Sequence, residues 1–408
     1  MSIVVQKYGG SSVADVGRIH KVADRVAATR ASGKDVVVVV SAMGDTTDEL
    51  LALARRVTEN PPRRELDMLL TAGERISMAL LSMALNARNV PAVSFTGSQS
   101  GIITNDSHTN ARIVEVRPFR VQDELARGKV VIVAGYQGVS YRKEVTTLGR
   151  GGSDTTAVAL AAALDAEACE IYSDVDGVYS ADPRVVREAR RLSEISYQEM
   201  QELAEAGARV LNAQAVEFAK DRGIALYARA TAGGPGETIV RKLPPRAPGR
   251  VAGVASEIGL ALVSVRGDRE TLERLLGFLD ERQAGGKQLV FLEHEREREG
   301  EGARGGGASL VLSLENLPDF AALRRDLLTA LGDALELREG IGAVSAIGAG
   351  INGDFANLRA ALTALERAGV PCFGVSTSSF RISVLTDEGR VDDAVRALHR
   401  RLVEGQPA

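Results

Sequence analysis

Short runs of β-branched and aliphatic residues alternate with longer stretches of helical periodicity over the first 240 residues of this chain. The strand candidates are residues 3–7, 36–41, 92–96, 130–134 and 170–172. The run 36–40 consists only of valine, which is typical of a strand covered on both faces. The alternation therefore predicts an α/β domain with a mostly parallel central sheet sandwiched by helices.

The composition changes near residues 242–249, where three prolines within five residues indicate a stiff linker. After it, residues 251–340 and 341–408 each carry a strand and helix pattern that fits a ferredoxin-like βαββαβ module. A charged, glycine-rich stretch at 293–307 reads as a loop in the first module. We therefore predict a first domain at 1–242, a linker at 243–250 and two modules.

The charge balance and the cysteines limit the partners. The formal net charge is −4 and tryptophan is absent, which disfavours nucleic acid as a partner. Cys169 and Cys372 form no CxxC or Cys/His cluster, so we predict no metal site and expect both to be reduced and buried. The chain shows neither a signal-peptide pattern nor an apolar run long enough for a membrane span, so we expect a cytoplasmic protein with no membrane partner.

Two glycine-rich polar turns flank an apolar helical run in residues 147–184. The first turn is 149–154, GRGGSD, and the second is 173–179, SDVDGVY. Glycines at a helix entrance let phosphate approach backbone N–H groups, where the helix dipole favours negative charge. Arg150 adds a planar fork suited to a carboxylate or a phosphate. The pattern indicates a site that handles phosphate together with an anionic acceptor.

Residues 7–12, KYGGSS, close the first strand pattern, at the edge of a parallel sheet where ligands gather. The spacing is not that of a Walker A loop, so the alternatives are a phosphate cradle and a plain strand-to-helix turn. Two later residues also have plain interpretations. Thr47 reads as a helix N-cap, and Glu74 reads as a solvated helix charge.

Five stretches together resemble the aspartokinases of the amino-acid kinase superfamily, in particular the actinobacterial type with two C-terminal ACT modules. They are residues 7–13, 41–44, 71–74, 149–156 and 173–184. The last stretch is similar to stretches in glutamate 5-kinase, UMP kinase and acetylglutamate kinase, so it indicates the nucleotide and not the acceptor. The resemblance implies transfer of the γ-phosphoryl group of ATP to the side-chain carboxylate of L-aspartate. The product would be 4-phospho-L-aspartate, on the way to lysine, threonine, methionine or a specialised metabolite.

The resemblance also implies a role for each site residue. Lys7 would neutralise the phosphoryl group in transfer and Asp154 would orient Lys7, which makes both catalytic. The ATP site would comprise Lys7, Tyr8, Gly9, Gly10, Ser41, Ser173, Asp174, Tyr179, Asp182, Arg184 and Arg209. The aspartate site would comprise Thr47, Glu74, Arg150, Gly151, Gly152, Ser153 and Asp154, with Arg150 on the α-carboxylate. The cofactor would be MgATP, with Mg²⁺ held mainly by phosphates and water.

Some positions depart from the family pattern. Arg209 stands where the family usually has a lysine that reaches the nucleotide; the charge is kept but presented differently. Gly267-Asp268 replaces the usual effector turn of the first module, and the helix entry at 352–355 in the second module is shortened. We therefore hypothesise that feedback inhibition by lysine plus threonine is weakened or absent. The resemblance implies a homodimer or homo-oligomer through the ACT modules, with an amino acid as effector.

Two other functions stay open at this stage. One is a related kinase that uses another small carboxylate acceptor. The other is a non-catalytic ACT sensor of amino acids with an inactive kinase domain. The charged residues Lys7, Arg150, Asp154 and Asp174 disfavour the sensor, because an inactive kinase usually loses such charges.

Overall fold

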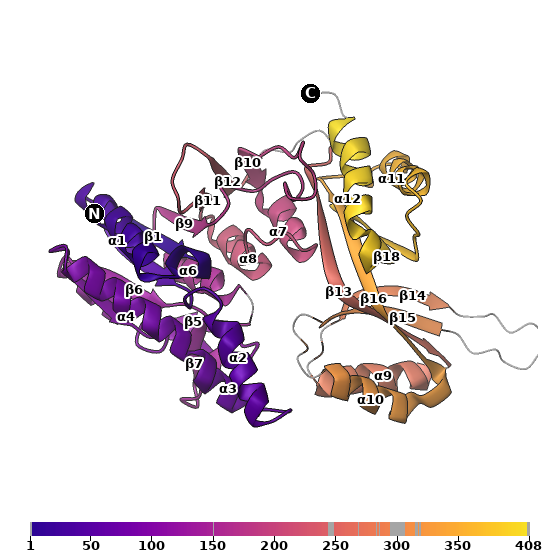
Figure 1. The fold of residues 1–408 in the computed structure, drawn as a ribbon, viewed down its shortest axis with the longest axis horizontal. Helices are drawn as coiled ribbons and strands as arrows, with labels where there is room; N and C mark the ends of the chain where they lie inside the picture. Colours follow the sequence, from indigo (N-terminus) through magenta and orange to yellow (C-terminus); the bar gives the residue numbers. More distant parts are fainter. Residues whose placement is uncertain are drawn as a thin grey trace, which may run out of the picture. The chain divides into compact units, whose positions relative to one another are not determined.

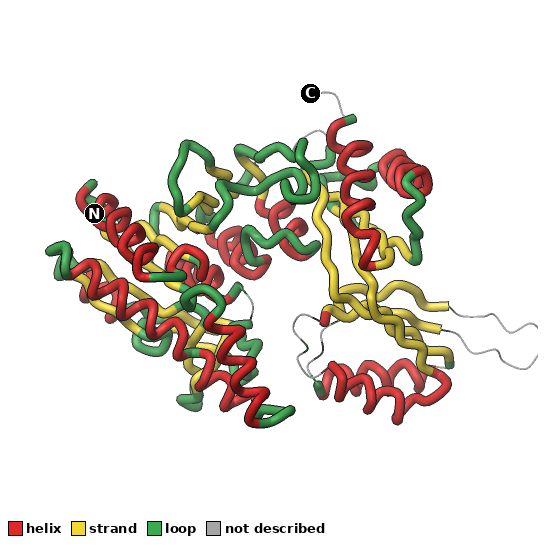
Figure 2. Tube along the Cα trace, viewed as in Figure 1, coloured by secondary structure: helices red, strands yellow, loops and turns green. Residues whose placement is uncertain are grey.

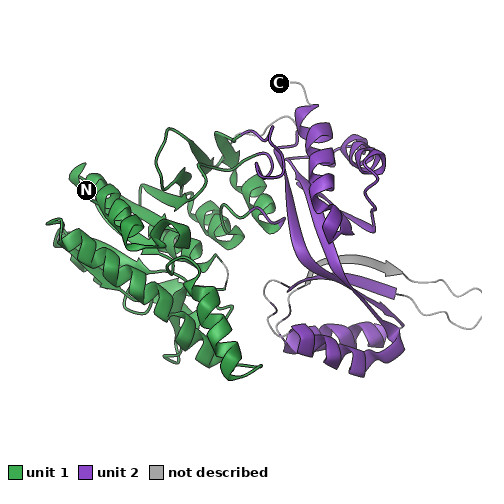
Figure 3. Ribbon diagram, viewed as in Figure 1, with its two compact units in different colours: residues 1–179, 191–205, 209–244 green, residues 180–190, 206–208, 245–408 purple. Residues whose placement is uncertain are grey.

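The computed structural model forms two compact units (Figure 3). Unit 1 comprises Met1–Tyr179, Arg191–Glu205 and Arg209–Pro244, and unit 2 comprises Ser180–Arg190, Ala206–Ala208 and Pro245–Ala408. The structure describes residues 2–149, 151–243, 249–267, 269–282, 284, 286–293, 307–314, 317 and 320–405, with only the backbone at 286–293. Four earlier predictions therefore fall wholly or largely outside the described residues. These concern Arg150, Asp268, the linker and the charged loop.

An eight-stranded sheet forms the centre of unit 1, in the order β10-β12-β11-β9-β1-β2-β6-β3 (Figure 1). Its strands are β1 (Ile3–Tyr8), β2 (Asp35–Val40), β3 (Ala92–Phe95), β6 (Val130–Ala134), β9 (Ala168–Ser173), β10 (Glu194–Ser196), β11 (Leu226–Ala230) and β12 (Glu237–Arg241). Within this sheet, neighbouring strands run parallel except β11 and β12. The predicted mostly parallel sheet is therefore confirmed.

Helices cover both faces of this sheet. The helices of unit 1 are α1 (Val16–Ala31), α2 (Thr46–Val57), α3 (Arg63–Leu70), α4 (Ala72–Asn86), α5 (Phe119–Ala126), α6 (Gly152–Ala163), α7 (Tyr197–Glu205) and α8 (Ala213–Arg222). On one face, residues of α1 and α4 share a buried cluster with Val36, Val38 and Val40 of β2. The intervening valines of β2 point to the opposite face, because side chains alternate along a strand. On that face α6 packs against β1, β2 and β9.

A second, four-stranded sheet in unit 1 was not predicted. It consists of β4 (Ile102–Thr104), β5 (Ile113–Val116), β7 (Gln137–Ser140) and β8 (Val145–Thr147). These strands have only three or four residues each, which is too short for a clear alternation of apolar and polar positions. Strand β8 leads directly into the glycine-rich turn at 149–154, so this small sheet positions part of the candidate site.

The helical stretch Arg63–Asn86 is long and apolar enough, by length and composition alone, to cross a membrane. Half of its most apolar window is buried within the protein. Met78, Leu81 and Leu85 of α4 pack into the core of unit 1 with α1 and the sheet. The stretch is therefore a core element of unit 1.

Unit 2 has one continuous six-stranded sheet, in the order β14-β15-β13-β16-β18-β17. Its strands are β13 (Gly253–Arg266), β14 (Gly286–Glu293), β15 (Gly307–Ser313), β16 (Leu335–Ile347), β17 (Gly374–Thr377) and β18 (Arg381–Asp387). Its helices are α9 (Arg269–Glu281), α10 (Phe320–Leu331), α11 (Ala356–Arg367) and α12 (Val391–His399), which continues as the π-helical turn Arg400–Glu404. Figure 2 shows α9 and α10 side by side along one end of this sheet.

The two halves of unit 2 have separate cores. Residues of α9 and α10 form one buried cluster, and residues of α11 and α12 form another. Each half combines two helices with part of the sheet, as expected for paired ferredoxin-like modules. The long strands β13 and β16 pair with each other along both halves, and the predicted boundary at residue 340 lies inside β16.

One segment of the kinase-like sequence belongs to unit 2. The chain leaves unit 1 after Tyr179 and returns at Arg191. Within this excursion, Ala181 and Val186 are buried in the core cluster of α11 and α12.

The cysteine prediction was half right. Cys169 is buried in β9, but Cys372 is exposed between α11 and β17, so the expected burial of Cys372 is wrong.

Candidate active site

An ion pair joins the end of β1 to the first turn of α6. The Nζ atom of Lys7 lies 2.6 Å from Oδ1 of Asp154, with side chains only 12% and 9% exposed. Lys7 lies one residue before the carboxyl end of β1, which is the edge where ligands of parallel sheets bind. The positive charge is thus held at this edge with little access to water.

The two glycines after β1 allow two strand-end turns to meet. The N–H of Gly9 donates to the carbonyl of Tyr172 at 3.2 Å, and the N–H of Gly44 donates to the carbonyl of Gly10 at 3.1 Å. A Cβ atom on Gly10 would lie 3.0 Å from the carbonyl oxygen of Ala42. This close backbone approach brings the turns after β1 and β2 together.

The glycines of the 149–154 turn build the entrance of α6. Gly151 is the N-cap, with a left-handed φ of 72°. A Cβ atom there would lie 2.4 Å from Nδ2 of Asn212, so the turn needs a glycine. Gly152, Ser153 and Asp154 form the first helical turn and are buried. Gly152 and Asp154 donate their N–H groups to the carbonyls of Gly149 and Gly151, and the positive end of the helix dipole favours an anion in front of this turn.

Glu74 is a buried carboxyl group, so its interpretation as a solvated helix charge is wrong. Its residue is 2% exposed, and Oε1 accepts the backbone N–H of Ala42 at 3.1 Å. Burial raises the pKa of Glu74 to about 7, although hydrogen bonds from backbone N–H groups oppose this. The hydroxyl of Ser77 donates to the carbonyl of Ser41 at 2.7 Å, which fixes the same turn. Glu74 therefore lies beside the end of β2.

Thr47 lies in the first turn of α2. The N-cap of this helix is Asp45, and Thr46 is its first residue. The plain N-cap interpretation of Thr47 is therefore wrong.

The second predicted turn lies at the end of β9. Ser173 is the last residue of that strand, and Asp174 after it is exposed. The hydroxyl of Tyr179 donates to Oδ1 of Asp176 at 2.7 Å, and Arg191 pairs with the other oxygen of Asp176 at 2.7 Å. These contacts fix the turn from both of its ends.

Other predicted nucleotide residues are placed differently. The ring of Tyr8 is buried and stacks on Tyr172 with centroids 4.8 Å apart, so only its main chain can meet a ligand. Asp182 and Arg184 belong to unit 2, where their side chains pair with each other at 2.7 Å. Arg209 belongs to unit 1 and is exposed. Within unit 1, the structure thus gathers the turns after β1, β2 and β9 and the start of α6.

Sequence reasoning missed Asp67 and His108. Asp67 in α3 is 0% exposed and accepts hydrogen bonds from Thr147, Thr109 and His108. Burial raises the pKa of Asp67, although these hydrogen bonds oppose the shift. The signal was present, because Asp67 falls between Leu66 and Leu70 on the apolar side of a helical pattern.

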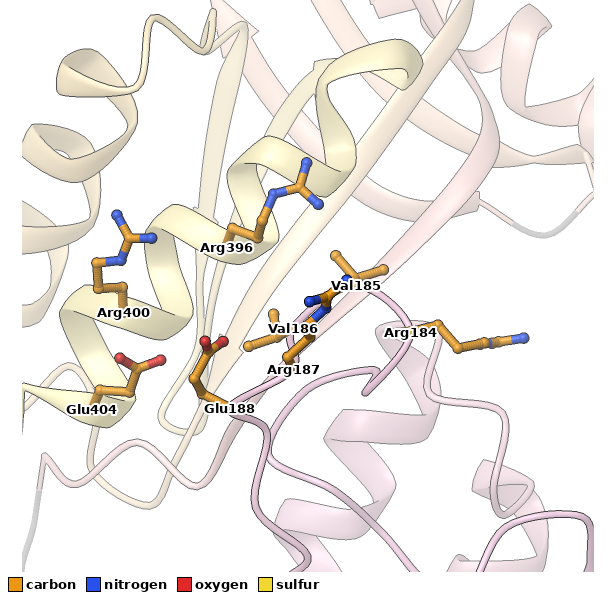
Figure 4. Close-up of a pocket in the computed structure, with 8 residues that line it drawn as sticks. All are labelled: Arg184, Val185, Val186, Arg187, Glu188, Arg396, Arg400 and Glu404. Atoms are coloured by element: carbon orange, nitrogen blue, oxygen red, sulfur yellow. The ribbon is translucent and has the colours of Figure 1, made fainter.

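A hollow of about 470 Å³ lies in unit 2 (Figure 4). It is lined by Arg184, Val185, Val186, Arg187, Glu188, Arg396, Arg400 and Glu404. Figure 4 shows the side chain of Arg184 extending away from the others. Buried His399 bridges Ser180 and Glu404, with Nε2 lying 2.9 Å from the hydroxyl of Ser180 and Nδ1 lying 2.9 Å from Oε1 of Glu404. The mixed arginine and glutamate lining favours no single class of ligand.

Comparisons with known proteins agree with this architecture. Residues 2–228 match the amino acid kinase family. The aspartokinase of Mycolicibacterium smegmatis is 45% identical over 420 residues, covering 98% of this chain and 96% of its own. The aspartokinase of Corynebacterium glutamicum is 43% identical over 429 residues, covering 99% of this chain and 97% of its own.

A solved structure of E. coli aspartokinase III in complex with aspartate and ADP is similar over 98% of this chain and 99% of its own. The TM-score is 0.83 and the identity is 25%. The same enzyme in complex with lysine and aspartate has a TM-score of 0.71 over 98% of this chain and 99% of its own. Both the kinase-like half and the C-terminal half therefore have counterparts in these proteins.

Proposed function

This chain belongs to the amino acid kinase family and, within it, to the aspartokinases, and from this we propose the reaction that its site performs. ATP donates its γ-phosphoryl group to the side-chain carboxylate of L-aspartate. A bond forms between a carboxylate oxygen and the γ-phosphorus, and the bond from that phosphorus to the β–γ bridging oxygen breaks. The products are 4-phospho-L-aspartate and ADP.

The observation that carries the proposal is the ion pair of Lys7 and Asp154 at the entrance of α6, where both side chains are largely shielded from solvent. Phosphoryl transfer to a carboxylate brings two anions together, so catalysis depends on positioning and on neutralising charge. Lys7 supplies a positive charge for the phosphoryl group in transfer, and Asp154 holds its ammonium group in place. The N–H group of Gly10 and the positive end of the α6 helix dipole add further partial positive charge.

L-Aspartate is proposed to bind between the 150–154 turn and α4. Arg150 would hold the α-carboxylate as a bidentate fork, with Gly151, Gly152 and Ser153 lining the turn. Glu74 and Thr47 would bind the ammonium end. Glu74 suits this role because an ammonium group beside a buried carboxylate stabilises its ionised form.

ATP is proposed to lie along the strand ends. The residues assigned to it are Lys7, Tyr8, Gly9, Gly10, Ser41, Ser173, Asp174, Tyr179, Asp182, Arg184 and Arg209. No group of three His, Cys, Asp or Glu residues that could hold a metal occurs in the described part of the chain. Mg²⁺ is assigned to the phosphates of ATP and to water, in keeping with its slow dehydration.

The C-terminal half is proposed to form a homodimer or larger homo-oligomer and to bind an amino acid. The lysine-bound structure of aspartokinase III supports an amino-acid effector, since its fold matches both halves of this chain. We place the protein in the cytoplasm as a soluble enzyme. Loss or weakening of inhibition by lysine plus threonine is part of the same proposal.

A hydroxylamine-trapping assay tests the reaction, because hydroxylamine converts an acyl phosphate into a hydroxamate. MgATP with L-aspartate should give hydroxamate, while L-glutamate and N-acetylglutamate should give little. Turnover of either of these in place of aspartate would favour a related kinase with another acceptor. Absence of turnover with all three would favour the amino-acid sensor.

A further inference from the structure

Asp67 is a fully buried carboxyl group with an unusually complete set of donors. Oδ1 accepts the hydroxyl of Thr147 at 2.6 Å and the backbone N–H of Thr109 at 3.1 Å. Oδ2 accepts Nδ1 of His108 at 2.7 Å and lies 3.2 Å from the same N–H of Thr109. When Asp67 is ionised its carboxyl group can only accept, and Nδ1 of His108 is then the donor.

These hydrogen bonds tie together three segments that are distant in sequence. Asp67 comes from α3, His108 and Thr109 come from the loop between β4 and β5, and Thr147 ends β8. A backbone hydrogen bond of 2.8 Å from Ala111 to Thr147 runs beside them. The carboxylate is thus the common acceptor at the junction of the three segments.

The 149–154 turn begins directly after this junction. Leu148 donates its N–H to the carbonyl of Tyr136 at 2.9 Å. A Cβ atom on Gly149 would lie 3.0 Å from Oδ1 of Asn110, so the turn rests against the loop that carries His108. The near end of the turn is therefore fixed by Thr147 and by this loop, and its far end by α6.

A buried carboxylate is costly unless its oxygens accept hydrogen bonds, and here three donors supply them, with the N–H of Thr109 shared between both oxygens. Removing one donor leaves the carboxylate partly unsatisfied, so the three segments would separate or admit water. An apolar replacement would leave the hydroxyl of Thr147 and the N–H of Thr109 without their acceptor. The network therefore stabilises one arrangement of the segments rather than merely filling space.

We propose that Asp67, through Thr147 and His108, is a positioning residue that fixes the start of the proposed aspartate-binding turn at Leu148 and Gly149. The proposal rests on the proposed function, which assigns L-aspartate to residues 150–154. Asp67 touches no reacting atom in this scheme. Its effect should fall on aspartate and not on ATP, because the proposed nucleotide residues after β1 and β9 make no contact with this network in the described part of the chain.

Two neighbouring threonines provide a matched test. Thr147→Val removes the hydroxyl that donates to Asp67. Thr146→Val removes an equally buried hydroxyl from the same strand, where it bonds to Thr104 at 2.6 Å instead. Thr147→Val should raise the KM for aspartate by about five- to ten-fold, while the KM for ATP stays within about two-fold. Thr146→Val should leave both constants within about two-fold of the wild-type values.

His108 gives an independent test at a partly exposed position, where its side chain is 21% exposed and the variant should fold. His108→Ala should also raise the KM for aspartate. His108→Asn should restore most of the affinity, because the amide nitrogen of asparagine can donate from nearly the place of Nδ1. Thermal midpoints of the three variants and of Thr146→Val, measured alongside, show whether stability alone explains the constants.

Three outcomes would overturn the proposal. Equal shifts for Thr147→Val and Thr146→Val would show a general effect of buried hydroxyls. Parallel rises in the KM values for aspartate and ATP would show loosening of the whole domain. An asparagine variant as impaired as the alanine variant would show that the hydrogen bond is irrelevant. Wild-type protein without aspartate turnover would instead count against the proposed function.

Discussion

The ammonium group of Lys7, one residue before the end of β1, forms an ion pair with the carboxylate of Asp154 in the first turn of α6. Neither side chain is well exposed, so each depends on the other for its charge compensation. The pair also fixes the distance between the proposed phosphate cradle and the proposed acceptor turn. Loss of either member should therefore affect catalysis beyond its own contact.

Lys7→Ala should lower kcat by about 10²- to 10³-fold or more, since a positive charge at the phosphoryl group is lost. Asp154→Asn should cause a smaller loss, because Lys7 remains but is no longer held. Lys34→Ala provides the control, as Lys34 pairs with Glu167 at 3.4 Å on the surface. Steady-state kinetics with aspartate and MgATP measure all three. Near-normal kcat in Lys7→Ala would remove the lysine from the mechanism.

The pH dependence of aspartate binding should report Glu74. Its pKa is about 7, so its ionised fraction rises as the pH rises through 7. If the ionised form binds the substrate ammonium, kcat/KM for aspartate should increase over the same range. Glu74→Gln should have a lower kcat/KM that no longer changes near pH 7. An unchanged pH profile in this variant would assign the titration to another group.

Glu74 should also make stability depend on pH in the absence of substrate. Its pKa is raised from 4.5 to about 7 on folding, so the folded state holds the proton more tightly. The stabilisation is fully present below pH 4.5 and is lost as the pH rises through 7. The difference amounts to about 3 kcal/mol across that interval. Denaturant unfolding of the wild type and Glu74→Gln at several pH values would measure it. The difference between their free energies of unfolding should be small below pH 4.5, and the wild type should become the less stable of the two as the pH rises through 7.

Arg209 tests whether the departure from the family's lysine matters. Arg209→Lys should keep the KM for ATP within about three-fold, because the charge is retained. Arg209→Ala should raise it by about ten-fold, a change typical of losing one charged hydrogen bond. Arg222→Ala, at the end of α8, serves as a control for general loss of positive charge. Equal KM values for ATP in the alanine variant and the wild type would exclude Arg209 from the nucleotide site.

Lysine and threonine together should inhibit this enzyme weakly or not at all. The expected cause is the altered helix entries of the two C-terminal modules. Initial rates with subsaturating aspartate, with and without millimolar lysine plus threonine, provide the measurement. Strong joint inhibition would show that the altered turns still form an effector site.

The hydrogen-bonded bridge at His399 should stabilise unit 2. His399→Ala removes two buried hydrogen bonds to Ser180 and Glu404 and leaves a cavity, at a cost of about 3 kcal/mol. A fall of several degrees in the midpoint of thermal unfolding is therefore expected. His20→Ala, at an exposed position of α1, gives the comparison. Similar midpoints for the two variants would contradict the bridge.

The sequence predicted the sheet and the main turns because their signals are local. The valine run of β2 predicts a buried strand, and the glycines beside Lys7 and Asp154 predict turns, from neighbouring residues alone. The four-stranded sheet escaped because its strands are short and pair only with segments far along the chain. The halves of unit 2 were predicted as modules, but nothing local indicates that β13 and β16 run through both.

The site was less predictable where burial decides a residue's role. Glu74 seemed solvated because glutamate usually is, and only the tertiary packing on Ala42 shows otherwise. The hydrogen bonds of Asp67 come from three residues in distant segments, and the residues next to Asp67 in the sequence do not indicate them. Asp182 and Arg184 follow directly in the motif after Tyr179, yet the chain carries them into the other unit. Adjacency in sequence therefore did not indicate which core a residue joins.

The segment Ser180–Arg190, which belongs to unit 2, has a consequence for expressing the two units as separate polypeptides. A cut in the linker near residue 244 would leave Ala181 and Val186 on the first polypeptide, although both belong to the core of unit 2. The first fragment would carry a surplus apolar segment, and the second would lack part of its interior. The two fragments should therefore be poorly soluble when expressed separately and should recover when co-expressed. A single cut at the linker therefore does not separate the two units.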